Sequence, residues 1–125
     1  MNIPLLIAAL LALLGTLVHE IGGERTNIKQ LLQTGMATNL TVELRMVWHL
    51  FAVDMAVSAI YLLLVGLGGV LPRSDPLLGF IALRFVLYGL VALLLVLVTQ
   101  RDHLLKVPQW LLLLGIGLLV WWGMA

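Results

Sequence analysis

The stretch that decides the fold is IPLLIAALLALLGTLVHEIGGE, residues 3–24. Residues 3 to 18 are almost entirely apolar, which is somewhat shorter than the ~20 residues that usually span a bilayer. No basic segment precedes this run, and His19-Glu20 stands where a signal peptide would carry its small-residue cleavage site. We therefore interpret the run as a retained membrane helix, which Gly22-Gly23 would end.

Three further apolar stretches predict three more membrane-spanning helices. They cover residues 46–70, 77–99 and 107–124, beside the first span at residues 3–19. Hydrophobic residues make up 62% of the chain and charged residues only 10%, whereas typical soluble domains carry about 25% charged residues. We therefore expect one all-α domain, residues 1–125, folded as an antiparallel bundle of four transmembrane helices.

Composition also excludes some kinds of function. The chain has no Cys, which rules out disulfides, thiolate metal sites and thiol redox chemistry. Its net charge of +1 is too small for a nucleic-acid-binding surface, so we expect no nucleic-acid partner. The expected partners are the lipid bilayer and either further copies of the chain or another membrane protein.

Residues with capping preferences mark the predicted helix boundaries. Thr41 is a suitable N-cap for the second helix, which would begin before its apolar part, and Gly68 would help to end that helix. Asp75 can cap the third helix, and Pro76 fits its first position. Pro108 suits the start of the fourth helix in the same way.

The basic residues predict the orientation in the membrane. The side reached by the ends of spans one and three carries Arg25, Lys29, Arg45, Arg101 and Lys106, whereas only Arg73 flanks the other side. By the positive-inside rule, the loop 20–45 should be cytoplasmic and both termini should face outward from a bacterial inner (plasma) membrane. Within this loop, residues 27–34 predict a short amphipathic helix that rests on the membrane surface or covers a site, and Gly35 would end it.

Four polar residues are expected near the cytoplasmic ends of the first two spans, namely His19, Glu20, Glu24 and His49. Imidazole and carboxylate groups suit Zn²⁺, Fe²⁺ or Mn²⁺, so His19, Glu24 and His49 are candidate ligands of a divalent metal. Haem is a less favoured cofactor, because the small residues beside each His indicate helices packed too closely to admit a porphyrin. Structural hydrogen bonds and a proton relay are the alternatives.

A second polar group lies inside spans two and three. Asp54, Ser58 and Tyr61 share one face of the second span and form a candidate proton or ion site. That face lies roughly 140° around the helix from His49. Arg84 enters the third span from the opposite side, at a depth that differs from that of Asp54 by roughly 13 Å. We therefore expect Arg84 to reach the outer interface, Tyr61, or an anion or lipid headgroup rather than Asp54.

Two short patterns carry a resemblance to a known group of proteins. They are His-x-x-x-Gly-Glu, formed by His19, Gly23 and Glu24, and the pair Trp48-His49. In these patterns the chain resembles a group of small, uncharacterised bacterial membrane proteins with four helices, whose polar residues recur at the inner ends of the first two spans. The resemblance implies that His19, Glu24 and His49 belong to one site, and it implies no activity.

Three classes of function remain. Small-residue stripes such as Ala8, Ala12 and Gly15 let helices pack closely, which favours an oligomeric or accessory membrane subunit without enzymatic activity. One alternative is a small proton-coupled transporter that uses Asp54. The other is a metal- or haem-binding membrane enzyme that acts on a lipid or quinone.

Overall fold

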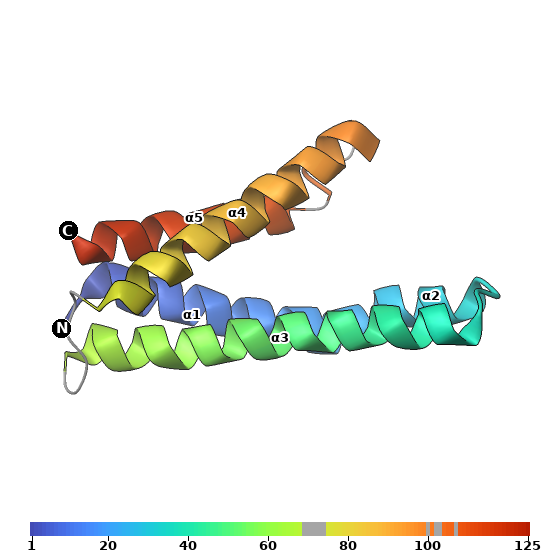
Figure 1. Cartoon of the computed structure of the whole chain (residues 1–125), viewed down its shortest axis with the longest axis horizontal. Coiled ribbons are helices and arrows are strands. Elements are labelled where there is room, and N and C mark those ends of the chain that lie inside the picture. Colours follow the sequence, from blue (N-terminus) through green and yellow to red (C-terminus); the bar gives the residue numbers. More distant parts are fainter. Residues whose placement is uncertain (69–74, 100, 102–103, 107) are drawn as a thin grey trace.

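The helices form two hairpins that lie side by side (Figure 1). The computed structural model describes residues 1–68, 75–99, 101, 104–106 and 108–125, and this part of the chain is helical apart from short turns. In the first hairpin, α1 (Ile3–Leu17) packs against α3 (Thr38–Leu67). In the second, α4 (Pro76–Thr99) packs against α5 (Gln109–Met124), and contacts between α1 and α5 join the two hairpins.

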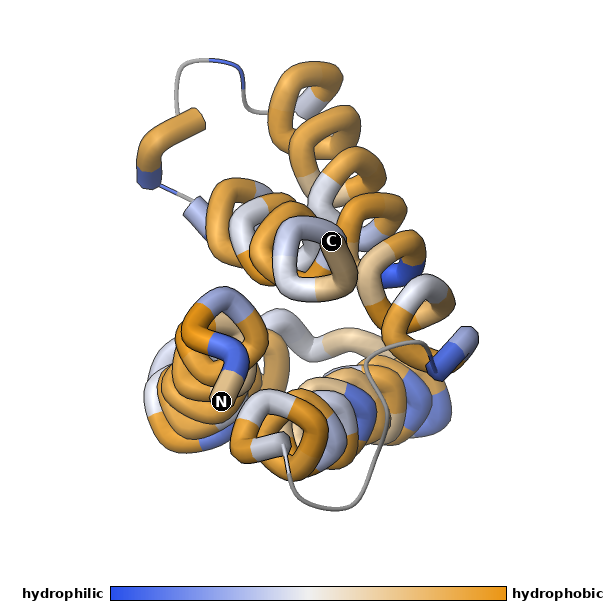
Figure 2. The backbone as a smooth tube through the Cα atoms, turned by 90° about the vertical axis from the view of Figure 1, so that its left-hand side faces the viewer, coloured by the Kyte–Doolittle hydropathy of each residue, from blue (hydrophilic) through white to orange (hydrophobic). Residues whose placement is uncertain are grey.

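The composition of the helices matches a membrane environment. Three of the described helices are long and apolar enough to cross a bilayer, and α5, with 16 residues, is apolar but shorter. Apolar residues dominate every helix when the molecule is viewed from its end (Figure 2). The prediction of an all-α fold is therefore confirmed, and three of the described helices could cross a membrane. Arg73 and the predicted span limits at residues 70 and 107 lie outside the described residues.

The first helix does not end at Gly22-Gly23, so this prediction is wrong. After α1 the chain continues through two π-helical segments, Val18–Gly22 and Glu24–Ile28, into α2 (Lys29–Gln33), making one rod of 31 residues. Gly23 keeps ordinary right-handed helical angles. A Cβ atom on Gly23 would lie 2.1 Å from the Trp48 side chain of α3. The glycine therefore serves the close approach of α3 and not the end of a helix.

Two further expectations in the connecting segment change as a consequence. The predicted surface helix at residues 27–34 is the last part of the first rod, although Gly35 does follow its end with a positive φ of 68°. The second helix begins at Thr38 and not near Thr41, whose hydroxyl instead donates to the carbonyl oxygen of Ala37 at 3.2 Å. Residues 20–45 therefore form the far end of a helical hairpin rather than a loop.

The predicted ends of the other helices are confirmed. Gly68 ends α3 in the left-handed conformation, with φ of 80°. The Asp75 carboxylate accepts a hydrogen bond from the Leu77 N–H at 2.9 Å, directly before α4 begins at Pro76. This hydrogen bond lowers the pKa of Asp75, because it favours the ionised carboxylate. Pro108 immediately precedes α5.

Asn2 ties three helices together at the end where both termini lie (Figure 1). Its side-chain oxygen accepts from the Leu5 N–H at 3.2 Å and so caps α1. Its backbone N–H donates to the Gly66 carbonyl of α3 at 2.7 Å, and its side-chain amide donates to the Gly123 carbonyl of α5 at 2.6 Å. The ends of α1, α3 and α5 are therefore held within hydrogen-bonding distance of one residue.

Glycines in α5 have different surroundings, which allows a test of the packing. A Cβ atom on Gly117 would lie 2.9 Å from the Ala82 carbonyl oxygen and 2.9 Å from the Val86 nitrogen, both in the backbone of α4. A Cβ atom on Gly115 would meet nothing within 4 Å. Close approach of backbones at small residues is a main source of helix association in lipid.

We predict that Gly117→Ala lowers the free energy of unfolding by about 1–3 kcal/mol, because α4 and α5 must move apart. Gly115→Ala should be neutral or stabilise by up to about 1 kcal/mol, because alanine is the better helix former. Unfolding of the purified protein in mild detergent, followed by circular dichroism, would measure both changes. Equal effects of the two substitutions would contradict the packing of α5 on α4.

Candidate functional site

An ion pair lies within the apolar spans and joins the two hairpins. Arg84 Nη1 of α4 is 2.6 Å from Asp54 Oδ1 of α3, and Arg84 Nη2 donates to the Ser58 hydroxyl. The exposed fractions of the Arg84 and Asp54 side chains are only 19% and 29%. The expectation that Arg84 avoids Asp54 is therefore wrong. Tyr61, which was expected to share the site, packs against the hydrophobic core about two turns beyond Asp54 on α3.

The predicted difference in depth between Arg84 and Asp54 was too large for two reasons. Residues were counted through the segment that connects α3 to α4, and the two helix axes were assumed to be parallel. Asp54 lies before the end of α3 at Leu67, and Arg84 lies after the start of α4 at Pro76. Counted from these ends, the two depths differ by about five residues, or roughly 7 Å. In addition, α4 runs at an angle to α3 (Figure 1). The long Arg84 side chain spans the remaining offset.

Aromatic rings of α4 surround the Arg84 guanidinium on its own helix. Its central carbon lies 5.7 Å from the Phe80 ring centre, 5.5 Å from that of Phe85 and 5.9 Å from that of Tyr88. At these distances the negative faces of the rings attract a cation. Asp54 and the rings therefore stabilise the guanidinium from different sides, which offsets part of its cost in an apolar environment.

A second group of charged residues joins the first rod to α3. Glu20 and Glu24 lie four residues apart on the rod, and Arg45 and His49 lie four residues apart on α3, so each pair shares a helix face. His49 Nδ1 is 3.0 Å from Glu20 Oε2, and Arg45 Nη2 is 2.7 Å from Glu24 Oε1. His49 Nε2 lies 3.9 Å from Glu24 Oε2. We call these four residues the charge ladder.

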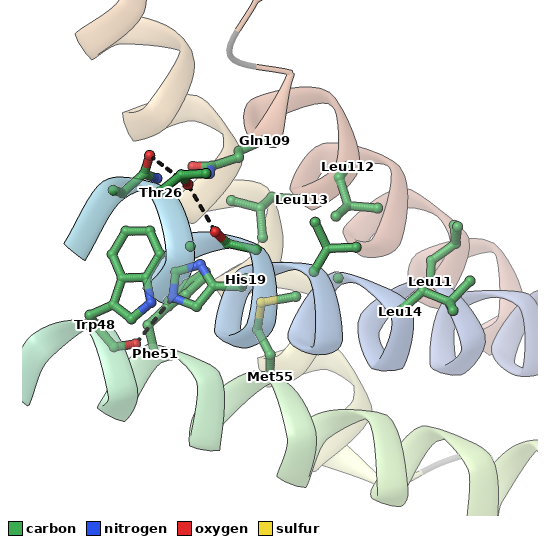
Figure 3. A pocket seen from close by; sticks show the side chains of 15 residues that line it. Leu11, Leu14, His19, Thr26, Trp48, Phe51, Met55, Gln109, Leu112 and Leu113 are labelled. Atoms are coloured by element: carbon green, nitrogen blue, oxygen red, sulfur yellow. Dashed lines mark hydrogen bonds between the residues drawn. The ribbon is translucent and has the colours of Figure 1, made fainter. Parts of the chain in front are cut away.

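His19 does not belong to the charge ladder. Its ring stacks on Trp48 with 3.9 Å between ring centres and 13° between planes, and Phe51 meets it edge-on at 5.2 Å. Its Nε2 is 3.2 Å from the Trp48 carbonyl oxygen (Figure 3). Because a carbonyl oxygen can only accept a hydrogen bond, this contact requires the tautomer with the proton on Nε2. The structure brings Glu20, Glu24 and His49 together, as expected, and separates them from His19.

This separation bears on the cofactor hypotheses. The described residues contain no group of three or more His, Asp or Glu side chains placed to hold a metal ion. The proposed ligand set of His19, Glu24 and His49 is therefore not assembled. His19 Nε2, the nitrogen through which this residue would bind haem iron, is turned toward the Trp48 carbonyl oxygen. A metal bound in another arrangement stays a prediction.

A cavity of about 470 Å³ opens beside His19, between the first rod, α3 and α5 (Figure 3). We call it the His19 cleft. It is lined at one end by apolar side chains, including Leu11, Leu14 and Leu112, and at the other by polar ones, including His19, Thr26 and Gln109. A second cavity of about 760 Å³ lies between α3 and α4 and shares Phe51, Gln109 and Leu113 with the first.

Three residues in these sites were not among the predicted site residues. Trp48 was noted only for its place beside His49 in the sequence. Arg45 was counted only among the flanking basic residues, but its four-residue spacing from His49 was a usable signal. Gln109 gave no signal, because its role depends on the position of α5 against the first rod.

Comparisons of the chain with protein-family models, with curated proteins and with solved structures found no match. The resemblance to small four-helix bacterial membrane proteins therefore stays a prediction. What the protein does must be inferred from the ion pair, the charge ladder and the His19 cleft.

A double-mutant cycle would test the Asp54–Arg84 pair. We predict that Asp54→Leu and Arg84→Leu each destabilise the protein by about 3 kcal/mol, because each leaves an unpaired charge among apolar helices. The double substitution should recover most of this loss, since both charges are then removed. Thermal unfolding of the variants in mild detergent would measure the coupling. Additive losses would show that the two side chains do not interact.

Proposed function

We propose that this protein is an accessory, non-enzymatic subunit of a bacterial inner-membrane assembly. In this proposal all four helices span the membrane, both termini face outward, and the far end of the α1–α3 hairpin is cytoplasmic. Two features support the topology: both termini lie at one end of the molecule (Figure 1), and Arg25, Lys29 and Arg45 lie on the far part of the hairpin.

The observation that carries the proposal is the length of the α1–α3 hairpin. Its two rods contain 31 and 30 residues, or roughly 45 Å each, against a hydrocarbon core of about 30 Å. The hairpin therefore projects beyond the membrane, with its tip near residues 34–37. We call residues 24–45 the hairpin extension. It begins at the level of the charge ladder, which suits the boundary between lipid and water.

The hairpin extension exposes apolar side chains that water would not favour. Leu32, Leu40 and Val42 have exposed fractions of 54%, 45% and 54%. Exposed apolar surface outside the hydrocarbon is typical of an interaction site. By contrast, Ala8 and Ala12, which were expected to support assembly, are buried within the chain. The assembly surface that we propose is therefore the hairpin extension, against a second copy or another membrane subunit.

The ionisable groups also favour a subunit over an enzyme. Asp54 is paired with Arg84, Glu24 with Arg45, and Glu20 with His49. Each of these pairs forms a contact between two helices. Joining elements is the role of such pairs in a structural or accessory protein.

Proton-coupled transport through Asp54 is the second candidate. The observation in its favour is that Asp54 Oδ2 is buried without a hydrogen-bond partner, although Oδ1 is paired. An intramembrane carboxylate with a free oxygen can take part in proton transfer. Transport would require the Arg84 pair to break during the cycle. Proton flux into liposomes that is lost in Asp54→Asn, with the fold intact, would favour this candidate.

A photo-cross-linking experiment tests the assembly surface. We predict that p-benzoylphenylalanine in place of Leu40, in membranes of expressing cells, gives one discrete adduct of higher mass than the 13.7 kDa chain. The control replaces Leu118 of α5, which is exposed but lies on an apolar helix outside the hairpin extension. A dimer mass would identify a second copy and another mass a different subunit. Absence of a discrete adduct at Leu40, or the same adduct at Leu118, would contradict the proposal.

A further inference from the structure

We propose that the His19 cleft binds one uncharged lipid of the diacylglycerol type. In this arrangement a hydrocarbon chain lies along the leucines of α1 and α5, and the hydroxyl-bearing head lies between His19 and Gln109. The site does not include the exposed apolar residues Leu32, Leu40 and Val42 of the proposed assembly surface, so it can be tested whether or not the protein assembles through that surface.

The polarity of the cleft changes along its length in the way that an amphiphile requires. Leu11 and Leu14 line the part inside the first span, whereas Thr26 and Asn27 line the part at the start of the hairpin extension. The lining therefore becomes more polar in the same direction in which one leaflet of the proposed membrane passes from hydrocarbon to headgroups. Gln109 faces the Thr26 end from the first turn of α5 (Figure 3). A lipid could enter with its chain and head already at the matching depths.

The size and shape of the cleft also fit a small ligand. Its volume of about 470 Å³ lies within the range of about 300–1,000 Å³ for small-molecule sites. Glycines at positions 15, 22 and 23 are among the lining residues that the first rod contributes. At Gly22 the space is open, because an added Cβ atom would meet only Val18 Cγ1, at 3.9 Å.

The lining indicates an uncharged head. Among the described residues that form the cleft, none is Lys, Arg, Asp or Glu. The hydrogen-bonding groups instead come from His19, Asn27 and Gln109, and an amide both donates and accepts. Trp48 Nε1 is an additional buried donor without a partner at the cleft wall. Hydroxyl and ester oxygens match this set, whereas a phosphate would lack a cation in the lining.

Native mass spectrometry of delipidated protein tests the proposal. Dioleoylglycerol is added to wild type, Gly22→Leu, Gln109→Leu and Gly115→Leu in mild detergent. We expect wild type to retain one dioleoylglycerol per chain and Gly22→Leu to bind at least tenfold more weakly, because leucine fills the open space. Gln109→Leu should weaken binding about tenfold through lost hydrogen bonds to the head. Gly115→Leu should bind as wild type does, since its side chain points into open space.

Circular dichroism of each variant shows whether it folds. If Gly22→Leu does not fold, Gln109→Leu still tests the site. The second arm replaces dioleoylglycerol by dioleoylphosphatidylglycerol, which has the same chains and an anionic head. Binding of both lipids with equal strength would overturn the inference of an uncharged head. No retained dioleoylglycerol in wild type, or undiminished binding in folded Gly22→Leu, would overturn the site itself.

Discussion

The hydrogen bonds of Asn2 hold the helices at one end, and the arrangement of the rest depends on this connection. One residue caps α1 and reaches carbonyl oxygens of α3 and α5, at Gly66 and Gly123. Lipid provides no hydrophobic force that drives apolar helices together, so polar links and close backbone packing decide which helices meet. Because these links gather where the termini lie, the two hairpins are free to separate toward the other end.

The Asp54–Arg84 pair limits that separation further along α3. It joins α3 to α4 in the region where α4 leaves the first hairpin at an angle (Figure 1). Beyond the pair, the hairpins are no longer held by a described polar contact between α3 and α4, and the second cavity opens there. The His19 cleft lies on the opposite side of Phe51 and Leu113, which line both cavities. Both cavities thus lie in the part of the molecule beyond the hydrogen bonds of Asn2 and the Asp54–Arg84 pair.

The features that could be predicted from the sequence are those that depend on neighbouring residues. Apolar runs gave the helices, and Gly68, Asp75 and Pro76 marked boundaries that the structure confirms. The errors concern contacts across the chain. Gly23 resembled a helix end, yet its role depends on Trp48, a residue far along the sequence. Similarly, spacing placed His19 and His49 at one level but could not tell that they face different neighbours.

In the proposed topology, the continuous first rod explains how the hairpin can pass from lipid into water with glycines at the boundary. A helix that ended at Gly22-Gly23 would leave unpaired carbonyl groups where little water is available. Continuing the helix keeps those groups bonded, and the charge ladder places Glu24 against Arg45, and Glu20 against His49, at the same level. Glu24 is therefore compensated by Arg45, and Glu20 lies within hydrogen-bonding distance of His49. In the proposed topology, the polar residues beside the apolar run stabilise the extension of the hairpin, and the exposed leucines beyond them belong to the proposed assembly surface.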